Sequence, residues 1–174
     1  MVRVLMVVLL CLLFVAKALS QTPEEVHKRQ NPCLYNDKAK EFNFWLGNWD
    51  VFVKDKKVGE NLIETGSNGC VLVENWSNLA GGTGKSLNVY DGKEGVWKQF
   101  YVGSQGGVLL FSGGLEGNVM RLRGETKGPK GEKIDNILEF HKLEDGSVRQ
   151  KWDQSSDGGK TWTTVWDSIY RKKA

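Results

Sequence analysis

The stretch Phe42-Asn43-Phe44-Trp45-Leu46-Gly47-Asn48-Trp49-Asp50-Val51-Phe52-Val53 decides the fold, because it joins a short apolar helix to a first strand. Phe42, Trp45 and Leu46 recur at helical spacing, which predicts a short helix within residues 37–46. Gly47 then begins a strand. We expect the helix to cover one end of a β-barrel whose wall starts at this glycine.

The rest of the chain consists of short runs in which apolar and polar residues alternate, as strands with one buried face require. Gly, Asn and Asp separate the runs, and no long amphipathic helix lies between them to carry a parallel crossover. The pattern therefore predicts an all-β, antiparallel, up-and-down barrel of about ten strands with a short N-terminal helix. The expected strands are 47–54, 58–66, 69–78, 84–91, 95–103, 107–113, 118–124, 134–142, 147–155 and 162–172.

Residues 1–20 have the features of a secretory signal peptide. Met1-Val2-Arg3 is a basic start, residues 4–16 form an apolar run, and Ala18-Leu19-Ser20 supplies the small residues of a cleavage site. A run of thirteen apolar residues is too short to span a bilayer. We therefore expect a secreted, extracellular protein with no membrane insertion after the signal peptide is removed.

Cleavage would leave a single domain, with residues 21–40 as an extended lead-in segment and residues 41–174 as the barrel. It would also remove Arg3 and Lys17, which lowers the formal net charge from +3 to +1. A nearly neutral chain of mixed charges does not match a nucleic-acid binder.

Two cysteines remain in the mature chain, Cys33 and Cys70. In an oxidising compartment such a pair is more readily explained by a disulfide than by free thiols. Only His27 and His141 could add ligands, and no Cys-x-x-Cys occurs, so we expect no metal site.

The alternation also predicts what faces the barrel interior. Trp97, Gln99 and Tyr101 share one face of their strand, and Gln150 and Trp152 share a face opposite three charged residues. A ligand cavity combines apolar walls with a few oriented polar groups, which fits this mixture. The amides could instead hydrogen-bond to one another inside a filled barrel, and the sequence leaves both interpretations open.

Glu74 and Trp76 add a carboxyl group and a further aromatic side chain to this interior. Burial would raise the pKa of Glu74, which suits a ligand contact or acid–base chemistry, although the carboxylate could simply pair with Arg121 or Arg149. Asn75 begins an N-glycosylation sequon, Asn-Trp-Ser, and points to solvent if Trp76 points inward.

Other motifs carry no chemistry. Residues 81–86 look like a phosphate loop but lack its first glycine and the following helix. Residues 155–162 match one Asp-box, which marks a hairpin turn in a chain too short for a propeller. His141 fits an exposed polar strand face better than a general base. We assign no catalytic residue.

Two ends of the chain together resemble the calycins, lipocalin-like closed barrels that mostly hold small apolar molecules. Gly47 and Trp49 form a Gly-x-Trp at the first strand, and Arg171 lies in the last strand. The resemblance implies that Arg171 lies across Trp49 and seals one end of the barrel, a cation–π contact worth about 0.5–2 kcal/mol.

Nearly the whole mature chain is also similar to an uncharacterised family of secreted lipocalin-like domains. That resemblance implies that the Glu-x-Trp, Trp-x-Gln and Arg-Gln-x-Trp positions face one interior. The segments that carry it are 44–51, 69–76, 84–91, 97–102, 148–152 and the Asp-box hairpin through Tyr170-Arg171.

We therefore expect a secreted binding protein that takes a small apolar or aromatic molecule and needs no cofactor. A structural component of the extracellular matrix with a filled barrel stays open, as does a cofactor-free isomerase or cyclase that uses Glu74. The expected ligand-binding residues are Glu74, Trp76, Trp97, Gln99, Tyr101, Gln150 and Trp152.

Overall fold

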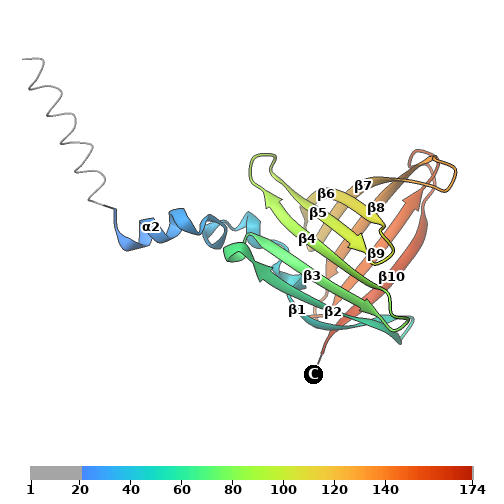
Figure 1. Cartoon of the computed structure of the whole chain (residues 1–174), viewed down its shortest axis with the longest axis horizontal. Coiled ribbons are helices and arrows are strands. Elements are labelled where there is room, and N and C mark those ends of the chain that lie inside the picture. Colours follow the sequence, from blue (N-terminus) through green and yellow to red (C-terminus); the bar gives the residue numbers. More distant parts are fainter. Residues whose placement is uncertain (1–20, 174) are drawn as a thin grey trace, which may run out of the picture.

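The computed structural model describes residues 21–173, which form a closed β-barrel preceded by a short helix (Figure 1). The expected signal peptide, residues 1–20, lies outside the described residues. Ten antiparallel strands follow one another around the barrel in sequence order, and the last pairs with the first. The strands are β1 (Gly47–Val53), β2 (Lys56–Gly66), β3 (Val71–Asn78), β4 (Thr83–Asp91), β5 (Val96–Gly103), β6 (Val108–Glu116), β7 (Val119–Lys127), β8 (Lys133–Lys142), β9 (Val148–Ser155) and β10 (Thr163–Lys172).

The predicted fold class is therefore confirmed. Each of the ten predicted runs became a strand, and no boundary differs from the prediction by more than three residues. The largest differences are at the ends of β6 and β7, which continue past the expected boundaries as far as Glu116 and Lys127. Both extensions pair with neighbouring strands, so cross-strand hydrogen bonds rather than alternation define these ends.

The lead-in segment 21–40, expected to be extended, is largely helical, which corrects that prediction. Helix α2 (Pro23–Gln30) begins after Thr22, whose Oγ1 accepts a hydrogen bond from the N–H of Glu25. The Glu25 carboxylate in turn accepts one from the N–H of Thr22. This reciprocal cap starts a helix with no buried side chain, so apolar periodicity could not reveal it. Figure 1 shows α2 projecting away from the barrel.

The expected disulfide joins this segment to the barrel wall. Cys33 lies in a 3₁₀ turn (Pro32–Tyr35), and Cys70 directly follows another 3₁₀ turn (Ser67–Gly69) between β2 and β3. The two Cα atoms are 5.0 Å apart. The covalent bond therefore holds residues near Cys33 against one end of the barrel.

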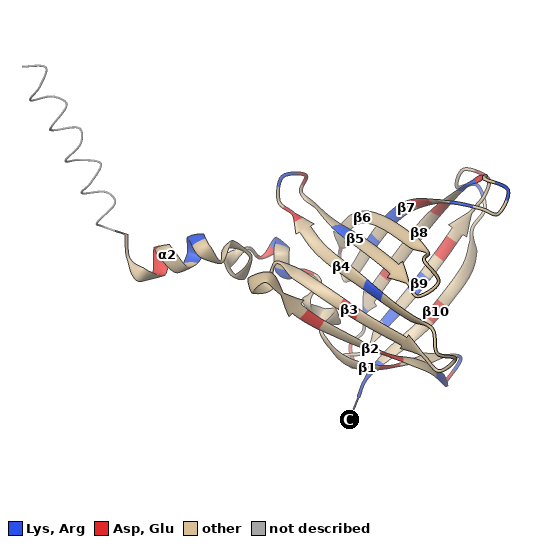
Figure 2. Ribbon diagram, viewed as in Figure 1, with Lys and Arg blue, Asp and Glu red and all other residues tan. Residues whose placement is uncertain are grey.

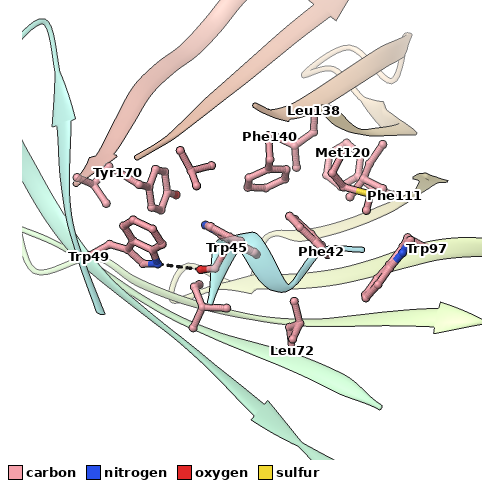
Figure 3. Close-up of a cluster of buried hydrophobic side chains, with 14 residues drawn as sticks. Phe42, Trp45, Trp49, Leu72, Trp97, Phe111, Met120, Leu138, Phe140 and Tyr170 are labelled. Carbon is pink, nitrogen blue, oxygen red and sulfur yellow. Dashed lines mark hydrogen bonds between the residues drawn. The ribbon is translucent and has the colours of Figure 1, made fainter. Parts of the chain in front are cut away.

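An apolar plug, defined here as residues 42–46, fills the same end of the barrel (Figure 3). The expected helix is replaced by two 3₁₀ turns, Lys38–Lys40 and Asn43–Trp45. Phe42 and Trp45 are completely buried and stack with their ring centres 5.0 Å apart. Phe140 packs against both rings, at 4.9 and 4.6 Å. Chain that precedes the first strand therefore contributes part of the barrel core.

Trp49 anchors the plug, as Figure 3 illustrates. Its indole N–H donates a buried hydrogen bond of 2.8 Å to the carbonyl oxygen of Trp45. The cation above Trp49 is Lys172 rather than the expected Arg171, because Lys172 lies directly opposite Trp49 in the β1–β10 pairing. Lys172 Nζ is 3.9 Å from the indole centre and donates a hydrogen bond of 2.5 Å to the Leu46 carbonyl.

Arg171 lies on the opposite, outer face of β10, which corrects its predicted role in sealing the barrel. Its guanidinium stacks over Phe52 at 4.6 Å and contacts the exposed Asp55. Gly47 keeps its expected role at this end. It adopts φ 137°, and a side chain there would meet the tip of Lys172.

Charged residues of both signs are spread along the strands (Figure 2). Arg149 on β9 makes two hydrogen bonds with Asp167 on β10, of 2.8 and 2.6 Å. Arg121 on β7 donates to Glu139 on β8, which also contacts His141. His141 therefore belongs to an outer polar network, in agreement with the prediction.

The Asp-box forms the turn between β9 and β10, as predicted. Asp157 accepts hydrogen bonds from the backbone N–H groups of Lys160 and Thr161 and from the Thr161 hydroxyl. These donors favour the ionised form and lower the pKa of Asp157 to about 2. Gly158 and Gly159 supply the positive φ angles of 72° and 84° that the turn requires.

Replacing both cysteines, Cys33→Ser with Cys70→Ser, is expected to lower the free energy of unfolding by about 3–4 kcal/mol. The reason is that the bond closes a chain segment of 37 residues in the unfolded state. Urea denaturation of the two proteins measures the difference. Reductant should lower the stability of the wild type by a similar amount and leave the double variant unchanged. Equal stability of the oxidised wild type and the variant would contradict this account.

Lys172→Ala is expected to destabilise the barrel by about 0.5–2 kcal/mol, the range of a partly desolvated cation–π contact. Arg171→Ala is the matched control, and it should cost less because Arg171 contacts exposed groups. Thermal unfolding of both variants tests the difference. A larger loss of stability in Arg171→Ala than in Lys172→Ala would show that the arginine, and not the lysine, closes this end of the barrel.

Candidate functional site

The part of the barrel interior that the plug does not fill contains a cavity of about 560 Å³. It lies between the plug and the hairpins at the opposite end, because Val58, Asn78, Leu109 and Val165 line it close to those hairpins. The volume falls within the range of about 300–1,000 Å³ that is usual for small-molecule sites. One end of the barrel is therefore packed with the side chains of the plug, whereas the interior towards the other end contains the cavity.

Three strands that run away from the plug carry the same order of inward side chains. On β3, β5 and β9 an apolar residue at the plug is followed two positions later by a polar residue and then by an aromatic one. A strand turns every second side chain to the same face, so each triplet spans plug, middle and cavity. The triplets are Leu72-Glu74-Trp76, Trp97-Gln99-Tyr101 and Val148-Gln150-Trp152.

Six of the fifteen residues that line the cavity are aromatic. Trp76 on β3 meets Trp166 on β10 edge to face, with the ring centres 6.1 Å apart. Trp152 on β9 meets Phe111 on β6 in the same way at 6.3 Å. Edge-to-face pairs fix ring orientation, so the wall has a defined shape.

Two glycines make room for these rings. A Cβ atom at Gly59 would overlap the ring of Trp76, and one at Gly84 would overlap the phenol of Tyr101. The outer end of each ring therefore lies close to the backbone of the neighbouring strand. This close approach leaves the centre of the barrel open instead of filling it with the rings.

A row of buried polar side chains separates the plug from the cavity. Gln99 Nε2 donates to Asn88 Oδ1, Asn88 Nδ2 donates to Ser86 Oγ, and both hydrogen bonds are 2.8 Å long. Ser86 Oγ then donates to Glu74 Oε2 at 2.6 Å, and Asn61 Nδ2 donates to Glu74 Oε1 at 2.7 Å. The two oxygens of the Glu74 carboxyl group therefore each accept a hydrogen bond, one from Ser86 and one from Asn61.

A second polar group faces the cavity from β9 and β10. The carbonyl oxygen of Gln150 accepts hydrogen bonds from the Tyr170 hydroxyl at 2.8 Å and from the Trp166 indole at 3.0 Å. Among the interior amides, the Gln99 side chain is hydrogen-bonded to that of Asn88. Gln150, by contrast, is held by aromatic donors.

Glu74 is buried without a counter-charge. Removal from water raises the pKa of its carboxyl group above the ordinary 4.5, and the hydrogen bonds from Ser86 and Asn61 only partly oppose this shift. The ion pairs considered for Glu74 do not form, because Arg121 pairs with Glu139 and Arg149 with Asp167. The carboxyl group therefore lines the cavity without forming either of these ion pairs.

Six of the seven predicted ligand-binding residues line the cavity, namely Glu74, Trp76, Gln99, Tyr101, Gln150 and Trp152. Trp97 points inward, as expected, but lies at the level of the plug, where it meets Phe42 edge to face at 5.7 Å. Trp97 does not belong to the residues that line the cavity. We therefore assign Trp97 to the core.

Sequence reasoning missed several residues of this site. Trp166 and Tyr170 alternate with Ser168 on the inner face of β10, a pattern that alone would have identified them. Asn61, Ser86 and Asn88 are buried but gave a weaker signal, since Asn and Ser are mostly exposed in proteins.

Asn75, the predicted glycosylation site, lies on the outer face of β3, with its side chain near Glu64 and Lys85. Within residues 21–173, no group of three or more His, Cys, Asp or Glu side chains is placed to hold a metal ion. No helix in the same part of the chain is long and apolar enough to cross a membrane.

The fold and site define a closed, ten-stranded antiparallel barrel with a partly hollow interior, consistent with a calycin-like fold. Searches with protein-family models and among curated proteins find no match to this chain.

Replacing Glu74 by Gln tests its electrostatic state. Because the folded-state pKa of Glu74 is raised, the folded protein holds this proton more tightly than the unfolded chain does. Its contribution to stability is therefore greatest below the unfolded-state value near pH 4.5 and falls as the pH rises through the folded-state pKa. Glu74→Gln cannot ionise, so its melting temperature relative to wild type should rise from acidic to neutral pH. The exposed Glu64→Gln is the control, and a difference that does not change with pH would refute the assignment.

Proposed function

We propose that this protein is a secreted, lipocalin-like binding protein that holds a small apolar or aromatic molecule inside its barrel. The observation that carries the proposal is the cavity of about 560 Å³, bounded by aromatic rings and by the carboxyl and amide groups of Glu74, Gln99 and Gln150. Apolar walls with a few fixed polar groups are the usual composition of small-molecule sites.

The contrast between the two ends of the barrel supports this proposal. The plug end is packed with rings such as Phe42, Trp45 and Phe140, which leave no exposed surface. A purely structural barrel could be filled in the same way along its whole length. Gly59 and Gly84 instead hold the rings of Trp76 and Tyr101 against the wall, which keeps space for a ligand.

Secretion is part of the proposal and rests on two features. Residues 1–20 have the pattern of a signal peptide, and Cys33 and Cys70 are joined by a disulfide, which persists in oxidising compartments. Glycosylation at Asn75 would fit the same route, because this side chain lies on the outer face.

The alternative function, a structural component of the extracellular matrix, would use the outer surface. Leu87, Phe100 and Leu110 are exposed and lie opposite one another across β4, β5 and β6, which gives such a partner an apolar contact. That function also calls for a filled barrel, whereas this interior contains a cavity of about 560 Å³. We therefore favour ligand binding.

A cofactor-free isomerase or cyclase would rely on Glu74 as its acid or base. Its raised pKa suits such chemistry, but the described cavity wall carries no second carboxyl group or histidine to share the proton transfers. Loss of any turnover in Glu74→Gln would be the mark of this alternative.

Trp152→Ala tests the proposed site, with the neutral, apolar dye Nile red as the probe. Nile red fluorescence should rise on binding to the wild type, and the variant should bind about tenfold more weakly because a central aromatic wall is lost. The fold should survive, since Asn136 keeps a hydrogen bond from Gln154 when the Trp152 indole is removed.

Trp162→Ala provides the matched control, because Trp162 is exposed in the Asp-box hairpin and does not line the cavity. Circular dichroism confirms whether each variant is folded. Unchanged dye affinity in a folded Trp152→Ala protein would move the binding site away from this cavity.

A further inference from the structure

The charges at the cavity wall restrict what the cavity can hold. Glu74 has the one carboxyl group among the described lining residues, and these residues include no lysine, arginine or histidine. A bound carboxylate or phosphate would lose its water, find no positive partner and lie near Glu74. Because burial of an unpaired charge is strongly unfavourable, the site disfavours anionic ligands such as fatty acids.

We propose that the natural ligand is an organic cation: an ammonium group on an apolar or aromatic body, with the ammonium bound at Glu74. This inference rests on the proposed function and names its ligand class. A cation supplies the counter-charge that the buried carboxyl group lacks, and that no described side chain provides.

The rings around Glu74 fit the same ligand. Asn61 Nδ2 lies within hydrogen-bond distance of both Glu74 Oε1, at 2.7 Å, and the Tyr170 hydroxyl, at 3.4 Å. The Tyr170 hydroxyl is thus near the carboxyl group. Trp76 follows Glu74 on the same face of β3. Aromatic faces carry a negative quadrupole, and they attract a desolvated cation by an amount comparable to a good hydrogen bond.

The polar row prepares Glu74 to carry a negative charge when the cation is present. Ser86 and Asn61 each donate a hydrogen bond to one of its two oxygens. Asn88 orients Ser86 by donating a hydrogen bond to its hydroxyl oxygen. Hydrogen bonds that point at a carboxyl group favour its ionised form, whereas burial disfavours it. Entry of an ammonium group shifts this balance towards the ionised carboxylate.

Three probes of one shape and different charge test the inference: phenethylamine, phenethyl alcohol and hydrocinnamate. Each is titrated at neutral pH against the protein loaded with Nile red, and displacement of the dye measures affinity. The inference predicts that phenethylamine binds at least about tenfold more tightly than phenethyl alcohol and that hydrocinnamate binds most weakly. Equal affinities, tightest binding of the alcohol, or no displacement by the amine would overturn it.

Glu74→Gln assigns the preference to its residue. This variant should bind phenethylamine no better than phenethyl alcohol, while the outer-face variant Glu64→Gln should keep the wild-type preference. A preference that survives in folded Glu74→Gln would also overturn the inference. The comparison of probes on the wild type stands even if this variant fails to fold. Nile red binding with displacement by the alcohol alone would leave the proposed function intact and reject the cationic ligand.

Discussion

The hydrogen bond from the Trp49 indole to the Trp45 carbonyl is the contact on which the arrangement of the barrel depends. It fixes the plug at the depth where the first strand begins, and Lys172 closes over both by contacting the Trp49 ring and the Leu46 carbonyl. With this end filled by chain outside the sheet, the strands need not fill the other end. The cavity is therefore a consequence of where the plug stops.

The polar row marks that boundary. Burying amides and a carboxyl group costs free energy unless each finds partners, so their presence in mid-barrel needs a reason. The hydrogen bonds from Gln99 through Asn88 and Ser86 satisfy most of these groups. They also direct donors towards Glu74, which keeps a carboxyl group at the cavity wall. The plug thus stabilises the barrel, and the polar row places hydrogen-bonding groups at the cavity wall, where a ligand could contact them.

The ten strands, the interior faces and the disulfide were predictable because alternation, turn residues and cysteine usage are local signals. Alternation determines a face but not a height along the barrel: Trp97 and Tyr101 share a face, yet four residues of strand place them about 13 Å apart. Likewise, a difference of one residue in the register of the last strand determines that Lys172, and not Arg171, lies opposite Trp49. Helix α2 was not predicted because its signal in the sequence is the Thr22–Glu25 cap alone.

The central claim, that the barrel holds a small molecule, is tested most directly by native mass spectrometry of the protein purified from a secretory host. The mass of the native protein is compared with the mass after denaturation. A small molecule released only on denaturation, and absent from Trp152→Ala, is the predicted result. A native mass equal to that of the bare chain, with no later binding from a library of amines, neutral aromatics and lipids, would contradict the account.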